Sequence, residues 1–106
     1  MIEVLISFDT AERIKEIQIT GHAPIEESYS LECAVVSTIV EILSLELKEF
    51  GNDFNEIKEK GLWRVAFPEN SELQSNLKRI LFAKLLLLKK LSQSHSDTVN
   101  LKIKEE

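Results

Sequence analysis

Two side chains in this 106-residue chain, Cys33 and His22, are of types that can support covalent chemistry together. Cys33 is expected in the first turn of a helix, where unpaired backbone amides and the helix dipole stabilise a thiolate. His22 follows a predicted strand, and the loop over 24–32 is long enough to bring it beside the helix start. A histidine within reach takes the thiol proton and returns it to a leaving amine. The pair therefore predicts nucleophilic catalysis, with the first-turn amides as an oxyanion hole.

Residue types alone also allow simpler roles for these side chains. A single cysteine at the start of an amphipathic helix is more often a small buried hydrophobe than a nucleophile. A reactive cysteine without a peptide substrate would instead be a thiol redox sensor. His95 lies in a polar stretch near the carboxyl end and is expected on the surface.

Two strands are predicted to lead to His22. Residues 2–8 and 14–20 alternate apolar and polar side chains, which is typical of half-buried strands. The second strand is expected to end at Gly21, because glycine permits unusual backbone angles and Pro24 cannot donate to a strand ladder.

A helix over 31–50 is predicted to position Cys33. Ser30 is its expected N-cap, since a serine hydroxyl accepts a hydrogen bond from a first-turn amide. Gly51 stands where a glycine C-cap belongs. The apolar stripe of this helix consists of Val36, Ile39, Val40, Leu43, Leu47 and Phe50.

A hairpin follows, with arms over 54–58 and 62–67 and a turn at 59–61. Trp63, Val65 and Phe67 share one face of the second arm. Trp63 and Phe67 are expected in the core or at a dimer face; an exposed aromatic pair would instead line a substrate groove.

A second helix is expected to open at 68–71 and to end where the polar run 92–97 begins; a short charged strand at 99–104 then closes the chain. The order β-β-α-β-β-α-β predicts one two-layer α+β domain over residues 1–106. It has a five-stranded mixed or antiparallel sheet with two helices on one face. The apolar stripe of the second helix is Leu73, Leu77, Ile80, Leu81, Leu85, Leu88 and Leu91.

Composition excludes several other classes of protein. Thirteen basic residues against eighteen acidic ones give a net charge of −5, which argues against direct nucleic-acid binding. One cysteine cannot close an intramolecular disulfide, and Cys33, His22 and His95 cannot supply a closed zinc site, so no metal or cofactor is expected.

The sequence also gives no reason to expect a membrane protein. The amino terminus lacks the features of a signal peptide. The most apolar stretch, 80–88, falls short of the roughly 20 residues that span a bilayer. We therefore expect a cytoplasmic protein without a membrane partner.

Gly21-His22-Ala23, a loop, and then Cys33-Ala34-Val35-Val36-Ser37 resemble the signature of the bacterial ribosomal-processing cysteine protease family. The resemblance covers essentially the whole chain. It implies a homodimeric cysteine endopeptidase that removes the N-terminal extension of a large-subunit ribosomal protein, number twenty-seven, during ribosome assembly. Carried over, Cys33 is the nucleophile, His22 the general base, and Ser37 a supporting group one helical turn further on. The family cuts after an aromatic residue, which implies an apolar pocket near Cys33.

The chain departs from the usual pattern of this family in the loop before the cysteine. Ser30 stands where family members usually carry an aspartate, and a serine can cap a helix but cannot stabilise an imidazolium. Residues 24–32 contain no glycine, and Pro24 stiffens the start of this loop. These departures motivate an alternative, in which the chain is a non-catalytic dimeric factor that binds a ribosomal protein or assists ribosome assembly.

Overall fold

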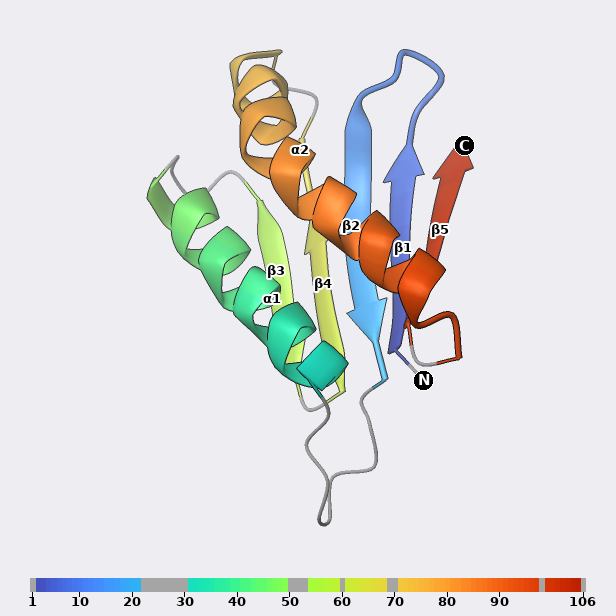
Figure 1. Ribbon diagram of the computed structural model, residues 1–106. Coiled ribbons are helices and arrows are strands. Elements are labelled where there is room, and N and C mark those ends of the chain that lie inside the picture. The colour runs from blue at the N-terminus through green and yellow to red at the C-terminus, as the bar shows by residue number, and fades with distance from the viewer. Residues whose placement is uncertain are drawn as a thin grey trace.

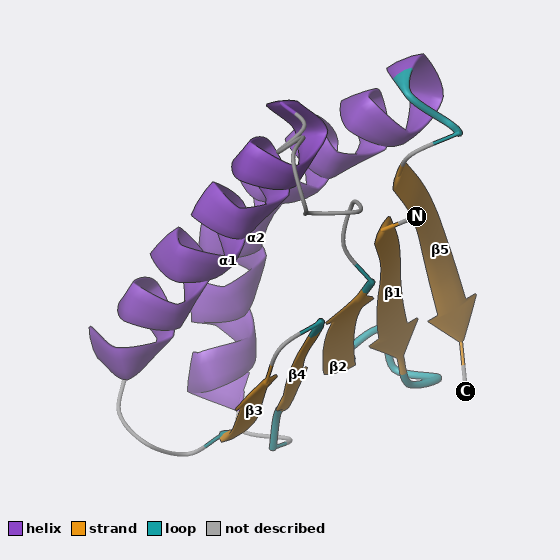
Figure 2. Ribbon diagram, turned by 90° about the horizontal axis from the view of Figure 1, so that it is seen from below, coloured by secondary structure: helices purple, strands orange, loops and turns teal. Residues whose placement is uncertain are grey.

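Two helices lie on one face of a five-stranded sheet in the computed structural model (Figures 1 and 2). This arrangement confirms the predicted α+β class and element order. The described residues are 2–21, 31–49, 54–59, 61–68, 71–97 and 99–105, with the backbone alone at 31–33 and 71–72. The elements are β1 (Ile2–Phe8), β2 (Ile14–Thr20), α1 (Leu31–Glu49), β3 (Asn55–Glu59), β4 (Leu62–Ala66), α2 (Ser71–Ser94) and β5 (Val99–Glu105).

The sheet is mixed, which is one of the two arrangements that the sequence allows. Its strand order is β3-β4-β2-β1-β5, and β5 runs parallel to β1 whereas the other neighbours are antiparallel. The chain crosses the sheet through α2 before it enters β5 (Figure 1). As a result Val99 pairs with Ile2 at the start of β1. The strands β3 and β5 form the two edges.

The core fills the space between the helices and the facing side of the sheet. Ile2, Val4 and Ile6 of β1 are almost completely buried, as expected for one face of a strand with period-two alternation. The predicted helical stripes are confirmed where the structure describes them, because burial follows the 3.6-residue period. From the helices, Val36, Ile39, Val40, Leu43, Leu47, Leu73, Leu77, Leu81 and Leu88 are buried, and Ile80, Leu85 and Leu91 pack against them.

The second helix differs from its prediction at one end. It continues to Ser94, one turn beyond the point where the polar run was expected to stop it. In this extra turn Ser92 Oγ accepts a hydrogen bond from Leu101 N at 3.2 Å, and Gln93 and Ser94 are exposed, so none of the three polar side chains has to enter the core. Phe50 and Gly51, predicted as the last stripe residue and the C-cap of the first helix, lie outside the described residues.

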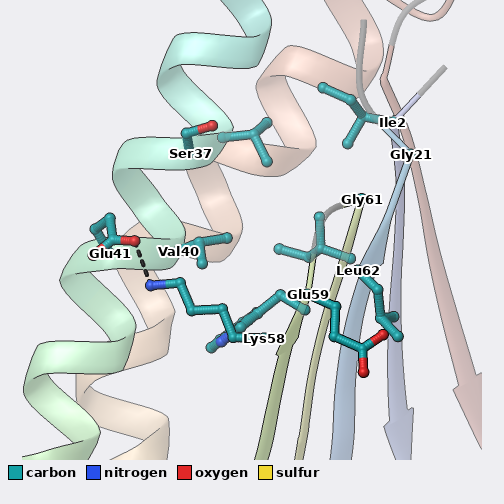
Figure 3. A pocket seen from close by; sticks show the side chains of 12 residues that line it. Ile2, Gly21, Ser37, Val40, Glu41, Lys58, Glu59, Gly61 and Leu62 are labelled. Carbon is teal, nitrogen blue, oxygen red and sulfur yellow. Dashed lines mark hydrogen bonds and ion pairs between the residues drawn. The ribbon is translucent and has the colours of Figure 1, made fainter.

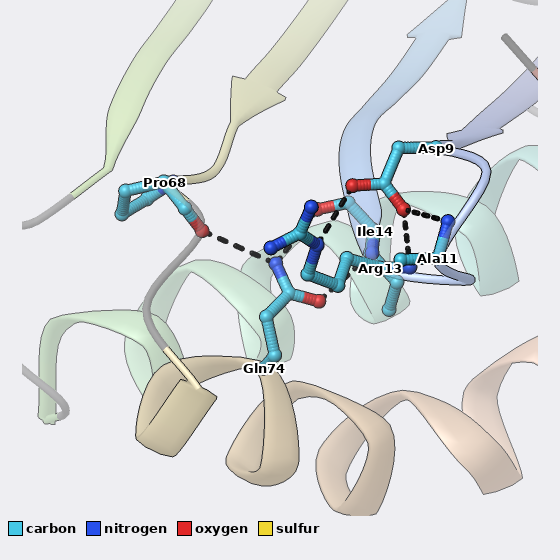
Figure 4. A network of polar contacts seen from close by, with 6 residues as sticks. All are labelled: Asp9, Ala11, Arg13, Ile14, Pro68 and Gln74. Carbon is cyan, nitrogen blue, oxygen red and sulfur yellow. Dashed lines mark hydrogen bonds and ion pairs between the residues drawn. The ribbon is translucent and has the colours of Figure 1, made fainter.

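Asp9 organises the turn between β1 and β2. Its Oδ1 accepts hydrogen bonds from the backbone N–H groups of Ala11 and Arg13, both at 2.9 Å, and its Oδ2 accepts one from Arg13 Nε at 2.8 Å (Figure 4). This carboxylate fixes a turn in which Glu12 adopts a positive φ of 62°, a conformation that costs energy for a residue with a Cβ.

Gln74 of α2 fastens that helix to the start of β2. Its side chain is buried, with Oε1 accepting from Ile14 N at 2.8 Å and Nε2 donating to Ile14 O at 2.9 Å and to Pro68 O at 3.2 Å (Figure 4). Buried backbone polar groups need such partners. The amide therefore sets where α2 lies on the sheet.

Candidate active site

The first turn of α1 contains Cys33, as the sequence predicts. The helix begins at Leu31, so Cys33 is its third residue and belongs to the turn whose amides have no partner within the helix. Its side chain, and the whole of His22 and Ser30, lie outside the described residues.

Gly21 ends β2 in the way that its sequence position predicts. Its φ is 83°, in the left-handed region that glycine enters without a steric penalty. Its backbone N–H donates to the carbonyl of Gly61 at 3.0 Å, and Gly61 itself has a φ of 78° in the β3–β4 turn. The end of β2 is therefore held against this hairpin, immediately before His22.

A pocket of about 210 Å³ opens between α1 and the ends of β2 and the β3–β4 hairpin (Figure 3). Gly21 and Ser37 both line it, so the structure brings two of the predicted site residues to one cavity. Its wall is mostly apolar, and polar side chains stand on its rim. The apolar lining consists of Ile2, Ile19, Val36, Val40, Leu62 and Trp63.

Two side chains of β3 reach across to α1 beside this pocket. Lys58 forms an ion pair with Glu41, and both residues line the pocket (Figure 3). Glu56 Oε2 accepts hydrogen bonds from Trp63 Nε1 at 2.7 Å and from Ser44 Oγ at 2.8 Å. The hairpin and α1 are thus joined by polar contacts along one side of the cavity.

The pKa of Glu56 lies below its usual range. Partial burial acts to raise this pKa. The hydrogen bonds donated by Trp63 and Ser44 and the positive charges of Lys48 and Lys58 act to lower it, and together they outweigh the effect of burial. The carboxylate that contacts Trp63 is therefore ionised at neutral pH.

Sequence reasoning did not identify Glu56, Lys58 or Glu41 as part of this region. The predicted turn at 59–61 would pair Lys58 with Leu62, so it gave the wrong register for the first two. In the structure Glu59 still belongs to β3 and pairs with Leu62; Lys58 therefore pairs with Trp63, and Glu56 lies diagonally across from the indole on the same face. No local signal points to Ser44 or Glu41, because their roles depend on where α1 lies over the sheet.

Within the described ranges, no three His, Cys, Asp or Glu side chains gather closely enough to hold a metal ion. Among the helices in the described part of the chain, none is both long and apolar enough to cross a membrane.

The fold and the pocket define an α+β protein with a cysteine in the first turn of the helix that borders a cleft. The family model of cysteine protease Prp matches residues 1–100. The chain therefore belongs to the cysteine protease Prp family, which confirms the predicted family and enzyme class. A search of curated proteins found no match.

Solved crystal structures share this fold over nearly the entire chain. SMU.848 from Streptococcus mutans is similar with a TM-score of 0.77 and 20% identity, covering 100% of this chain and 99% of that one. The ribosomal processing protease Prp from S. aureus, in complex with a covalently linked product peptide, gives a TM-score of 0.72 and 19% identity, with 97% and 99% covered. The same protease with a substrate peptide gives 0.71 and 14%, again with 97% and 99% covered.

Proposed function

We propose that this chain is a cysteine endopeptidase that removes the N-terminal extension of a large-subunit ribosomal protein during ribosome assembly. The observation that carries the proposal is the match of the cysteine protease Prp family to residues 1–100. The S. aureus relative is a ribosomal processing protease found with a covalently linked product peptide, which supports the same substrate class and a covalent route here.

The face of α1 that borders the pocket supports Cys33 as the nucleophile. Val36, Ser37, Val40 and Glu41 line the pocket, at the spacing of one helical face. Cys33 precedes Val36 by three residues and Ser37 by four, so it belongs to the same face one turn nearer the helix start. Gly21, on the opposite side of the pocket, directly precedes His22.

The proposed reaction uses Cys33 and His22 in two stages. His22 takes the thiol proton, and the sulfur attacks the scissile carbonyl carbon while first-turn amides of α1 stabilise the oxyanion. The C–N bond then breaks, and His22 returns the proton to the leaving amine. A water molecule, deprotonated by His22, hydrolyses the thioester and restores the thiol.

The other predicted residues have supporting roles in this proposal. Ser30 caps the helix, Gly21 turns the chain so that His22 approaches α1, and Ser37 supports the reacting groups from one turn further along. The apolar pocket receives the side chain of the residue before the scissile bond, which the family resemblance predicts to be aromatic.

The test is to incubate the chain with the N-terminal region of the ribosomal protein from the same organism. Replacing the nucleophile by Cys33→Ala should reduce the cleavage rate by about 10⁴-fold or more. Loss of the base in His22→Ala should reduce it by about 10²- to 10⁴-fold. His95→Ala is the matched control and should cleave normally, since His95 follows the last turn of α2 and does not itself line the pocket.

Cleavage that survives Cys33→Ala would contradict the proposal. If Cys33→Ala instead leaves both ribosomal-protein binding and the cellular phenotype intact, the non-catalytic assembly factor that Ser30 and the glycine-free loop suggest is the better assignment. Fast iodoacetamide labelling of Cys33 without any cleavage would favour a thiol redox sensor.

We also propose that the chain is a cytoplasmic homodimer that pairs through its outer helix layer. Five large apolar side chains are exposed there, and a groove of about 370 Å³ runs between the helices. The sequence of α1 has four acidic residues and one basic residue, whereas α2 has five basic and one acidic. Glu46 and Lys84 already form an ion pair within one copy at 2.7 Å, and packing α1 against α2 of a second copy matches the remaining charges. The exposed apolar residues are Ile42, Leu45, Phe82, Leu86 and Leu87.

Light scattering during size-exclusion chromatography tests the dimer. Phe82→Lys combined with Leu86→Lys should convert a dimer to a monomer, whereas exchange of the exposed Lys104 for glutamate on β5 should not. A wild-type monomer at micromolar concentration would contradict the dimer proposal without affecting the assigned reaction.

A further inference from the structure

The edge strand β3 reverses the usual distribution of side chains between the core and solvent. Its helix-facing positions carry Glu56 and Lys58, while Ile57 points to the opposite face and is 42% exposed. None of the five residues of β3, all of them described, is buried. A strand whose purpose was packing would place apolar residues toward the helices. Local conflicts of this kind are expected where a surface has a function.

The charged side chains on this inverted face hold β3 to α1. Glu56 contacts Ser44, and Lys58 contacts Glu41 one helical turn earlier on α1. Figure 3 shows the Lys58–Glu41 contact spanning the space between the hairpin and the helix. These two contacts join the walls of the pocket, so they set how far apart the hairpin and α1 stand.

Trp63 forms part of the pocket wall, and Glu56 is the hydrogen-bond acceptor for its indole N–H. The indole is 3% exposed and lines the pocket, opposite Ile19 of β2. A buried indole N–H needs an acceptor, and Glu56 Oε2 supplies it at 2.7 Å. An ionised acceptor makes a shorter and stronger bond than a neutral one. The same oxygen accepts from Ser44, so one atom connects the ring to α1.

We propose that Glu56 is a positioning residue for substrate specificity. One of its oxygens accepts hydrogen bonds from both Trp63 Nε1 and Ser44 Oγ, and this fixes the indole as a wall of the pocket. The pocket receives a large apolar side chain of the peptide substrate. This inference rests on the proposed peptidase function. Glu56 does not touch the substrate. It acts through Trp63 and through the separation of the hairpin from α1.

Trp63 is the chain's only tryptophan, so its fluorescence reports directly on this wall. In a Cys33→Ala background, a peptide with an aromatic residue before the cleavage site should shift or quench the emission in a saturable way. Glu56→Ala should weaken that binding by about 10-fold, the size expected when a charged hydrogen bond is lost. Glu56→Gln, which keeps an acceptor oxygen, should recover part of it.

Kinetics in the active protein separate a positioning role from a purely structural one. Glu56→Ala should raise KM about 10-fold for the aromatic peptide with a smaller change in kcat, and should reduce the preference for that peptide over one with alanine at the same position. Ser44→Ala, which keeps the acceptor for Trp63, should change KM less than Glu56→Ala. Glu49→Gln is the matched control, because Glu49 is exposed in the last turn of α1.

The two proposals fail in different ways. Normal KM, peptide preference and fluorescence titration in Glu56→Ala would overturn the role of Glu56 while leaving the peptidase assignment intact. Glu56-dependent binding without cleavage would overturn the peptidase assignment but keep the pocket. If Glu56→Ala does not fold, Glu56→Gln and Ser44→Ala decide the question, and wild-type values in both would reject the proposal.

Discussion

The sheet carries two networks of polar side chains, and they are used differently. Where β1 turns into β2, Asp9 and Gln74 direct their oxygen and nitrogen atoms mainly to backbone groups. Glu56, midway along the sheet, and Lys58, nearer its other end and lining the pocket, contact side chains of neighbouring elements. The first network joins side chains to backbone groups, whereas the second joins side chains to one another near the pocket.

This difference separates groups that hold the fold from groups that shape a site. A side chain that satisfies buried backbone atoms can be removed only by leaving those atoms without a partner. Removing a side chain that holds another one at a pocket also leaves a buried group without its partner, as with Trp63 Nε1, but it changes the shape and charge of the pocket in addition. Substitutions in the Asp9 and Gln74 network should therefore change stability and leave kinetics unchanged, whereas those around the pocket should change kinetics as well.

Gln74→Ala should have the largest effect on stability. It removes three hydrogen bonds and leaves the backbone N–H of Ile14 buried without this acceptor, so we expect the free energy of unfolding to fall by about 2–3 kcal/mol. Urea denaturation measures this loss. Gln93→Ala is the matched control: its exposed amide lies on the same helix, and its change should stay within about 0.5 kcal/mol.

The comparison of the two networks is sharpened by kinetics on the Gln74→Ala protein. At a temperature where it remains folded, KM and kcat should match the wild type. A change in KM as large as that of Glu56→Ala would show that the two networks are not independent.

Replacement of Asp9 should have a smaller effect that depends on pH. The backbone N–H of Arg13 first, and also the Arg13 guanidinium and the N–H of Ala11, lower the pKa of Asp9, although desolvation opposes them. The folded chain therefore binds this proton less readily than the unfolded chain. The resulting stabilisation is present above the ordinary aspartate pKa of about 3.9, and it is lost as the pH falls through the lower folded value.

Thermal denaturation of Asp9→Ala and Asp9→Asn measures this contribution. Asp9→Ala should lower Tm by a few degrees at pH 7, and Asp9→Asn, which keeps an acceptor for the turn, should lower it less. Both differences from the wild type should shrink in acid. A difference that grows as the pH falls from 5 to 2 would contradict the role assigned to the ionised carboxylate.

The elements of the fold were predictable because each has a strong local pattern. The alternation in 2–8 and the apolar stripe from Val36 to Leu47 specify their structures with little help from elsewhere. Sequence could not choose between a mixed and an antiparallel sheet, since the partner of β5 is set by how α2 crosses the sheet. The extra turn of α2 was missed because its polar residues carry no apolar stripe, and the one contact that Ser92 makes there, with Leu101, joins residues that come together only in the folded chain.

The candidate site divides in the same way. Gly21 and the helical position of Cys33 follow from local sequence, and the structure agrees on both. The wall that Glu56 and Trp63 build needs two further facts, the register of a hairpin and the position of α1 over it. Only the first of these is encoded near Trp63, in the turn at Gly61.

Ser37→Ala should have the smallest effect, and it isolates the pocket from the fold. Ser37 is exposed on α1 and lines the pocket, so its removal should change the free energy of unfolding by less than about 0.5 kcal/mol. If its hydroxyl supports the reacting groups, kcat/KM should fall by about 2- to 10-fold, the equivalent of one hydrogen bond. Thr38→Ala is the matched control, because Thr38 bonds the carbonyl of Ala34 and does not line this pocket. Of these two residues, Ser37 borders the cavity and Thr38 does not. Equal losses of kcat/KM in the two variants would therefore mean that Ser37 acts through the stability of the helix and not through the pocket.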